Sequence, residues 1–264
     1  MLKKIVDSCV LSFMLLLLLP GMSAAQTLTA KTEIIDTNCH GFYQWLPAGY
    51  DKTGSEYPLL ILLHGMGELG NGESELPKVL RNGAMKLVAE NKFPSSFMVN
   101  NTEYHFIIFA PQFIHWPWPG TVYAILKYAL THYRVDQKRI YLSGLSMGGG
   151  ATWECVGNSR EWAEKLAAIV PVCGASLADS SKAAIIASAG LPVWATHNQG
   201  DPVVTVEFTE KYIKYIKAVP GQVKMDVRKT IFPETNHNAW TKTYDPAWKE
   251  DGMNIYEWML SHHR

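Results

Sequence analysis

The sequence lacks an excess of charge of either sign. Its 264 residues include 24 Lys and Arg against 24 Asp and Glu, so the formal net charge at pH 7 is +0 with histidine neutral. A protein that binds nucleic acid or an anionic membrane surface through its charge needs an excess of positively charged residues. The composition therefore predicts no nucleic-acid partner and no stable membrane association, and it favours a partner that is neutral or only locally charged.

Cysteine is also scarce. Cys9 lies in the N-terminal segment, which leaves Cys39, Cys155 and Cys173. Three cysteines without a C-x-x-C spacing indicate neither a zinc site nor a disulfide framework. One disulfide remains an alternative in an oxidising compartment, but buried free thiols are the preferred interpretation. We therefore expect no metal site.

Long hydrophobic runs are absent after the N-terminus. The one such run, residues 10–19, follows Lys3 and Lys4 and precedes small residues that end at Ala25. This order is typical of a secretory signal peptide, here residues 1–25 with cleavage after Ala25. A membrane anchor is the less favoured alternative because the run is short for a bilayer span. The protein is therefore expected to be secreted or periplasmic.

No linker, repeat or low-complexity stretch divides residues 26–264, so we expect one catalytic domain with a substantial core. Apolar runs alternate with amphipathic stretches, which predicts an α/β fold: a mostly parallel sheet with helices on both faces. Strands are expected at residues 31–35, 42–46, 59–63, 106–110, 140–143, 168–172, 193–196 and 223–231. Helices are expected at residues 76–90 (broken at 82–83), 122–133, 147–156, 182–189, 206–216 and 252–262. In such sheets ligands bind at the carboxyl ends of the strands.

The most informative motif is G-x-S-x-G at residues 144–148, with Ser146 at its centre. A bare motif of this kind arises by chance in roughly one chain in ten of this length. Here it follows an apolar strand and opens a helical pattern, which is typical of a nucleophile elbow. Such a turn exposes the serine hydroxyl and brings the backbone N–H of Met147 to the place where an oxyanion forms. Ser146 is therefore the expected nucleophile.

A serine nucleophile needs a base and an acid, which follow it in the order Asp or Glu, then His. Asp201 comes after the strand expected at 193–196, and His237 comes after the last strand. Both are therefore expected at the same sheet edge as Ser146. We predict that His237 is the general base and that Asp201 orients it. His64 and His197 are rival bases, but they precede or adjoin strands in the wrong order.

The second oxyanion donor is expected in the glycine-rich loop after residues 59–63, which reads HGMGELG from His64 to Gly70. The N–H of Met66 is the first choice and that of Gly65 the second. A phosphate-binding loop is the competing interpretation, but the Gly-Lys-Ser/Thr ending of a P-loop is missing. For Glu68 the preferred expectation is a salt bridge that braces the loop, and a role as a site residue is the alternative.

The chain resembles the secreted serine esterases related to feruloyl and acetylxylan esterases and to polyhydroxybutyrate depolymerases. The resemblance covers nearly the whole mature chain. It rests on LHGMGE at 63–68, APQ at 110–112, YRVD at 133–136, RIYLSGLSMGG at 139–149, VPVCG at 170–174 and HNAW at 237–240. It implies an α/β-hydrolase fold, carboxylic-ester hydrolase activity and no cofactor. One departure is Asn198-Gln199, where relatives often carry a glycine after the histidine.

Residues 174–191 are too few for a large lid, so the site should be open, with Trp116 and Trp240 as substrate-binding aromatics. The expected function is that of a secreted serine carboxylesterase with an acyl-enzyme intermediate, acting on feruloyl or acetyl esters of plant-wall carbohydrate. The alternatives are a polyester depolymerase or a serine peptidase on the same fold, and, least favoured, a non-catalytic binding protein. The oligomeric state does not follow from the sequence.

Overall fold

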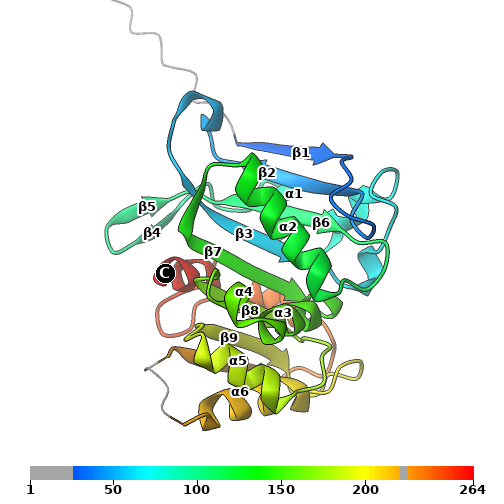
Figure 1. Cartoon of the computed structure of the whole chain (residues 1–264), viewed down its shortest axis with the longest axis vertical. Helices are drawn as coiled ribbons and strands as arrows, with labels where there is room; N and C mark the ends of the chain where they lie inside the picture. Colours follow the sequence, from blue (N-terminus) through cyan, green and yellow to red (C-terminus); the bar gives the residue numbers. More distant parts are fainter. Residues whose placement is uncertain (1–25, 221–224) are drawn as a thin grey trace, which may run out of the picture.

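The computed structural model describes residues 26–220 and 225–264, and the expected signal peptide lies outside them. An eight-stranded sheet forms the centre, in the order β1-β2-β6-β3-β7-β8-β9-β10 (Figure 1). Its strands are β1 Thr27–Lys31, β2 Gly41–Leu46, β3 Tyr57–Leu63, β6 Ile107–Gln112, β7 Val135–Leu145, β8 Ala168–Val172, β9 Val193–Asn198 and β10 Val227–Phe232. From β6 through β10 all neighbours are parallel, whereas β2 pairs antiparallel with both β1 and β6. The predicted mostly parallel sheet is confirmed.

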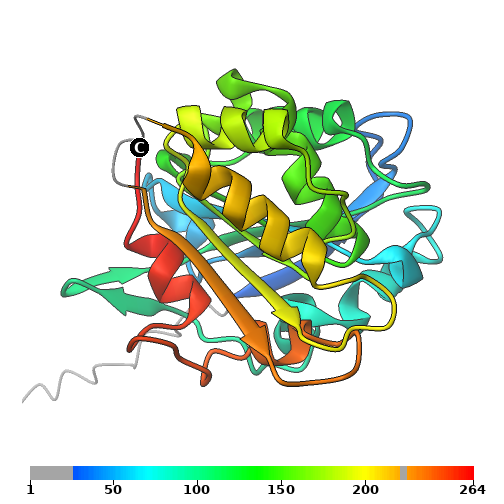
Figure 2. The ribbon, with the colours of Figure 1, turned by 90° about the horizontal axis from the view of Figure 1, so that it is seen from below.

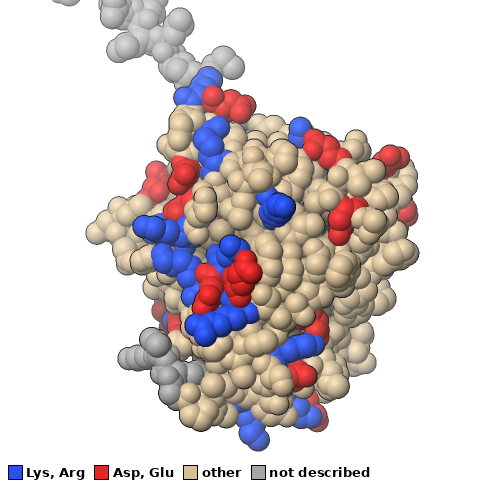
Figure 3. All heavy atoms as spheres, viewed as in Figure 1, with Lys and Arg blue, Asp and Glu red and all other residues tan. Residues whose placement is uncertain are grey.

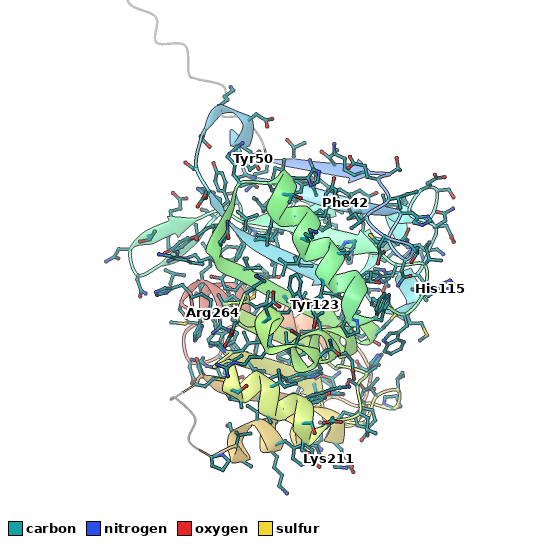
Figure 4. All side chains as sticks on the ribbon, in the orientation of Figure 1. Phe42, Tyr50, His115, Tyr123, Lys211 and Arg264 are labelled. Carbon is teal, nitrogen blue, oxygen red and sulfur yellow. The ribbon has the colours of Figure 1, made fainter. Side chains whose placement is uncertain are left out.

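Helices cover both faces of the sheet (Figures 1 and 2). One face carries α2 Pro119–His132, α3 Met147–Asn158, α4 Arg160–Ala163, α5 Ser180–Ser188 and α6 Glu207–Ala218; the other carries η3 Leu76–Arg81, α1 Gly83–Ala89 and α8 Ile255–Leu260. Every residue of β3 is buried because the sheet is covered on both sides. The core accordingly has two parts, one on each face. Phe42, labelled in Figure 4, belongs to the α2 side, where its ring stacks on Phe109 at 4.2 Å.

Several boundaries differ from the sequence-based expectations. The first strand lies at Thr27–Lys31 rather than 31–35, because residues 27–31 pair with the edge of β2, and Ile34 is left exposed. The hairpin of β4 Phe97–Val99 and β5 Thr102–Tyr104 was not expected. The last strand was expected from residue 223; its first two residues lie outside the described ranges, and β10 begins at Val227. The expected break before α1 is present, with Gly83 at φ 61°.

The surface is mixed in charge. On the face shown in Figure 3, basic and acidic side chains lie interspersed among a larger uncharged area. Cys39, Cys155 and Cys173 are all free and buried, as preferred from the sequence. Within residues 26–220 and 225–264 no helix has both the length and the apolar character that crossing a membrane requires.

Candidate active site

Ser146 occupies the sharp turn between β7 and α3. Its backbone has φ 53° and ψ −113°, a strained conformation for a residue with a side chain. The turn closes so tightly that a Cβ on Gly144 would stand 2.3 Å from the carbonyl oxygen of Gly148. A Cβ on Gly148 would likewise stand 2.2 Å from the carbonyl oxygen of Leu63. The two glycines of the motif are therefore required by contact, and the N–H of Ser146 is tied to the Val172 carbonyl at 2.9 Å.

The structure brings Ser146, His237 and Asp201 into one hydrogen-bonded line at the carboxyl ends of the strands. His237 Nε2 lies 2.8 Å from Ser146 Oγ, and His237 Nδ1 lies 2.6 Å from Asp201 Oδ2. The other carboxylate oxygen of Asp201 accepts the N–H groups of Val203 and Val204 at 2.8 and 3.0 Å. The carboxyl group is fully buried, while the imidazole of His237 keeps 15% of its surface exposed. This geometry is suited to drawing the hydroxyl proton from Ser146.

The two expected oxyanion donors lie on either side of the nucleophile. Met147 is the first residue of α3, and Met66 opens the short helix η2 Met66–Glu68. A Cβ on Gly65 would stand 3.6 Å from Ser146 Cβ, so the loop lies directly against the nucleophile. Neither the Met66 N–H nor the Met147 N–H has an acceptor within the described part of the chain. Both donors thus remain available to an incoming oxygen, whereas the Met66 side chain itself is exposed.

Two buried side chains hold this loop. His64 Nε2 accepts the Phe113 N–H at 2.9 Å, so its Nδ1 carries the proton that is donated to the Gly65 carbonyl at 2.7 Å. Burial lowers the pKa of His64 to about 4, and the ring stays neutral. Gln112, at the end of β6, donates to the Glu68 carbonyl at 2.9 Å. His64 is therefore not positioned as the base. The loop-holding role of Gln112 was missed, although a polar residue at the end of an apolar strand marks such a position.

His197 lies behind Asp201, on the side away from Ser146. Its Nε2 is 2.9 Å from the Val204 carbonyl and 3.2 Å from Asp201 Oδ2. Since a carbonyl only accepts, Nε2 carries the proton, and Nδ1 accepts the hydroxyl of Thr209 at 2.8 Å. Burial lowers the pKa of this fully buried ring, which favours the neutral form. His197 contacts the acid of the site rather than the nucleophile.

The salt bridge expected for Glu68 is not present among the described residues. Its carboxylate is buried and accepts the amide of Asn82 at 2.6 Å instead, and burial raises the pKa of Glu68. Asn82 in turn accepts the indole N–H of Trp240 at 3.2 Å. The edge of the Trp240 ring meets His237 with centroids 5.2 Å apart. Asn82 was another residue that the sequence did not single out; it stands at the helix break that the sequence predicted.

The two tryptophans expected at the substrate take different positions. Trp240 is partly buried against His237. Trp116 is 41% exposed and lines a surface groove of about 350 Å³ together with the exposed Trp118 and Leu177. His115, labelled in Figure 4, marks the edge of the molecule on which this loop lies. Ala175 also lines this groove, and its N–H donates to the backbone carbonyl of Ser146 at 3.0 Å, so the groove lies on the segment that packs against the start of α3.

Within the described residues, Cys173, Asp201 and His237 are the one group of ligating side chains close enough to share a metal ion, with their donor atoms within 4.8 Å. Two of the three are already hydrogen-bonded to each other. Burial raises the pKa of the Cys173 thiol far above its usual range, so the thiolate that a metal would need is strongly disfavoured. The donor set fits a hydrogen-bonded pair beside a thiol better than a metal centre.

Comparison with known proteins gives one family match: the phospholipase/carboxylesterase model fits residues 120–247, which include Ser146, Asp201 and His237. A bifunctional acetylxylan esterase/xylanase, XynS20E of Neocallimastix patriciarum, is 27% identical over 203 residues. The match covers 72% of this chain but 26% of that protein, so the chain spans about a quarter of its relative's length.

Solved structures share the fold. A thermostable esterase superposes with a TM-score of 0.58 at 23% identity, over 90% of this chain and 63% of that one. A feruloyl esterase module from Clostridium thermocellum superposes with a TM-score of 0.54 at 17% identity, over 81% and 82% of the two chains. The chain has the α/β-hydrolase fold and resembles the feruloyl and acetylxylan esterase group. Together the comparisons support a carboxylic-ester hydrolase.

Proposed function

We propose that this protein is a secreted serine carboxylic-ester hydrolase that uses Ser146, His237 and Asp201 as its catalytic triad. The observation that carries the proposal is the line of hydrogen bonds from Ser146 Oγ through His237 to the buried Asp201 carboxylate, at 2.8 and 2.6 Å. Secretion rests on the signal-peptide pattern of residues 1–25, and the catalytic domain is residues 26–264.

In the proposed mechanism His237 takes the proton of Ser146 Oγ as that oxygen attacks the ester carbonyl. Asp201 accepts a hydrogen bond from the Nδ1–H group, remains ionised and stabilises the imidazolium that forms. The carbonyl oxygen becomes an oxyanion, which the free N–H groups of Met66 and Met147 stabilise. His237 then gives its proton to the leaving alcohol. Water then takes the place of the alcohol: His237 accepts its proton as it attacks the acyl-enzyme, and the proton returns to Ser146 Oγ as the carboxylic acid leaves.

The proposed substrates are feruloyl or acetyl esters of plant-wall carbohydrate. The Trp116–Trp118–Leu177 groove supports a bulky, ring-containing group beside the nucleophile, since aromatic faces bind sugars and phenolic rings well. The name of the curated relative, an acetylxylan esterase/xylanase, favours the same class of substrate.

Ser146→Ala tests the proposal. Removal of a triad nucleophile lowers kcat by about 10⁴-fold or more and should leave folding intact. Turnover of p-nitrophenyl acetate, acetylxylan and methyl ferulate would be measured, together with labelling by a serine-reactive fluorophosphonate. Ser188→Ala, on the exposed face of α5, is the matched control and should retain both activity and labelling. Full turnover by Ser146→Ala would overturn the triad assignment.

A further inference from the structure

A small cavity lies beneath the loop that carries Met66. Glu68, Asn82, Gly83, Leu145 and Tyr244 contribute to its wall, and its volume is about 20 Å³. A space of this size holds about one water-sized group. Leu145 directly precedes the nucleophile, so the cavity adjoins the elbow from below.

The carboxyl group of Glu68 is the acidic part of this wall, beside the polar side chains of His64, Asn82 and Tyr244. The point where a Gly65 Cβ would stand is 3.1 Å from Glu68 Oε2 and 3.6 Å from Ser146 Cβ. This carboxyl group is therefore close to the place where the acyl carbon of an ester must bind. The side chain is only 4% exposed and belongs to the cavity wall rather than to the outer surface.

Glu68 is poorly supplied with hydrogen bonds. A carboxylate can accept about four, but the one well-formed bond to this group comes from Asn82 at 2.6 Å. The backbone N–H groups of Gly65 and Glu68 lower the pKa of the carboxyl group somewhat, without reaching good hydrogen-bond geometry, and burial still raises that pKa overall. A buried acceptor with spare capacity favours a ligand that brings a hydroxyl group to it.

We propose that Glu68 selects the acyl group, and that the site prefers short acyl groups with a hydroxyl on the carbon next to the carbonyl, such as glycolyl, over apolar groups of equal size. This inference rests on the proposed esterase function. An apolar group in the cavity would cover the carboxyl group without giving its oxygens a hydrogen-bond donor, and sites built around a polar group discriminate strongly against such ligands. The cavity is also too small for a feruloyl ring, so acetyl-sized groups are favoured over feruloyl among the substrates proposed above.

In this proposal the alcohol part of the ester binds on the other side of the site. The groove beside Trp116, at about 350 Å³, is far larger than the cavity beside Glu68. The two spaces suit a small acyl group and a large alcohol. Glu68 should therefore respond to changes in the acyl group and not to changes in the alcohol.

The test compares kcat/KM for ethyl glycolate and ethyl propionate, which differ only by a hydroxyl in place of a methyl group. Glu68→Met should lower the glycolate-to-propionate ratio by at least tenfold, whereas Glu68→Gln, which keeps an acceptor, should stay within about threefold of the wild-type ratio. Comparing ratios between variants cancels the different intrinsic reactivities of the two esters. Glu161→Met is the control, because it makes the same substitution at an exposed position of α4 outside this cavity and should leave the ratio unchanged.

An unchanged ratio in Glu68→Met would overturn the proposal and would mean that Glu68 only braces the loop or binds a water. The proposal would also be overturned if Glu68→Met instead changed the ratio of kcat/KM between esters that differ in the alcohol, for example ethyl and benzyl acetate. If Glu68→Met does not fold, the wild-type protein still decides, because faster cleavage of methyl ferulate than of methyl glycolate contradicts the small polar acyl pocket. A wild-type protein that cleaves no ester would instead contradict the proposed function itself.

Discussion

Three histidines surround the nucleophile, and they differ in burial and in the partners that they contact. His237 lies on a loop, keeps part of its ring exposed and faces Ser146 Oγ. His197 and His64 are buried at strand ends, and both ring nitrogens of each are engaged by other groups. A general base needs one free nitrogen toward the nucleophile and an environment that tolerates its positive charge. Of these three, only His237 meets both conditions.

The buried pair instead hold the groups that His237 and the substrate need. His197 contacts the Asp201 carboxylate at 3.2 Å from behind, and His64 joins the Gly65 carbonyl to the N–H of Phe113. One therefore supports the acid, and the other supports the loop of the proposed oxyanion donor. In the proposed mechanism the same residue type thus acts as the base where it is partly exposed, and it positions other groups where it is buried.

The sharpest test of this contrast is His237→Ala. Because triad members act as a unit, we expect the loss in kcat to approach that of Ser146→Ala, about 10⁴-fold or more. Steady-state kinetics on p-nitrophenyl acetate measures it, and Tm should change little because the loop side chain is partly exposed. A larger loss on substituting His197 would reverse the two assignments.

His197→Phe should have a smaller effect, on the order of 10- to 100-fold in kcat with little change in KM. The substitution keeps an aromatic ring but removes the N–H beside Asp201 Oδ2, so the acid is held less firmly. A purely structural role would lower the amount of folded enzyme and leave kcat per folded molecule unchanged.

His64 should affect the free energy of unfolding rather than the catalytic rate. Burial depresses its pKa in the folded state to about 4, against an ordinary value of 6.5. Below pH 6.5 the unfolded chain gains a proton that the folded protein does not, so the stability contributed by the neutral ring is lost as the pH falls from 6.5 to about 4. The lost free energy of unfolding is on the order of 3 kcal/mol.

Urea unfolding at pH 7 and pH 4.5 would measure this loss. His64→Gln should reduce the difference between the two pH values, although His197, whose pKa is also lowered, still contributes to it. His132→Gln, at the exposed end of α2, is the control and should change nothing. An equal loss in wild type and His64→Gln would contradict the buried neutral ring.

The sequence predicted the centre of the fold better than its edges. The strand at Ala168–Val172 was placed with its observed bounds, because a fully buried parallel strand is a continuous apolar run. The edge strand β1 was shifted toward the apolar pair at 34–35, because β1 is short and none of its residues is fully buried. The β4–β5 hairpin was missed although its turn, Asn100-Asn101, has the positive φ values of 50° and 61° for which asparagine is well suited.

Chain order was enough to expect Ser146, Asp201 and His237 at one edge, because the carboxyl ends of parallel strands meet there. It could not reveal the hydrogen bonds that Gln112 and Asn82 make, or the contact of His197 with the Asp201 carboxylate. Those contacts join residues from separate elements through side-chain hydrogen bonds, and no spacing in the sequence encodes these partners, although the place of Gln112 at a strand end marks it as a candidate. Glu68 shows the same limit: its partner proved to be an amide across the loop and not a cation.

The smallest effects should separate the two tryptophans. Trp116 touches the open groove, so Trp116→Ala should lower kcat/KM for acetylxylan several-fold more than for p-nitrophenyl acetate, since a stacking contact is worth about 0.5–1.5 kcal/mol. Trp240 instead packs against His237 and holds Asn82. Trp240→Ala should therefore lower kcat/KM for both substrates alike. Trp240→Phe, which keeps an aromatic ring beside His237 but loses the indole N–H, should retain more of the activity. A substrate-selective loss in Trp240→Ala would show that this ring contacts the substrate after all, and an equal loss on both substrates in Trp116→Ala would remove the groove as the binding surface for the alcohol.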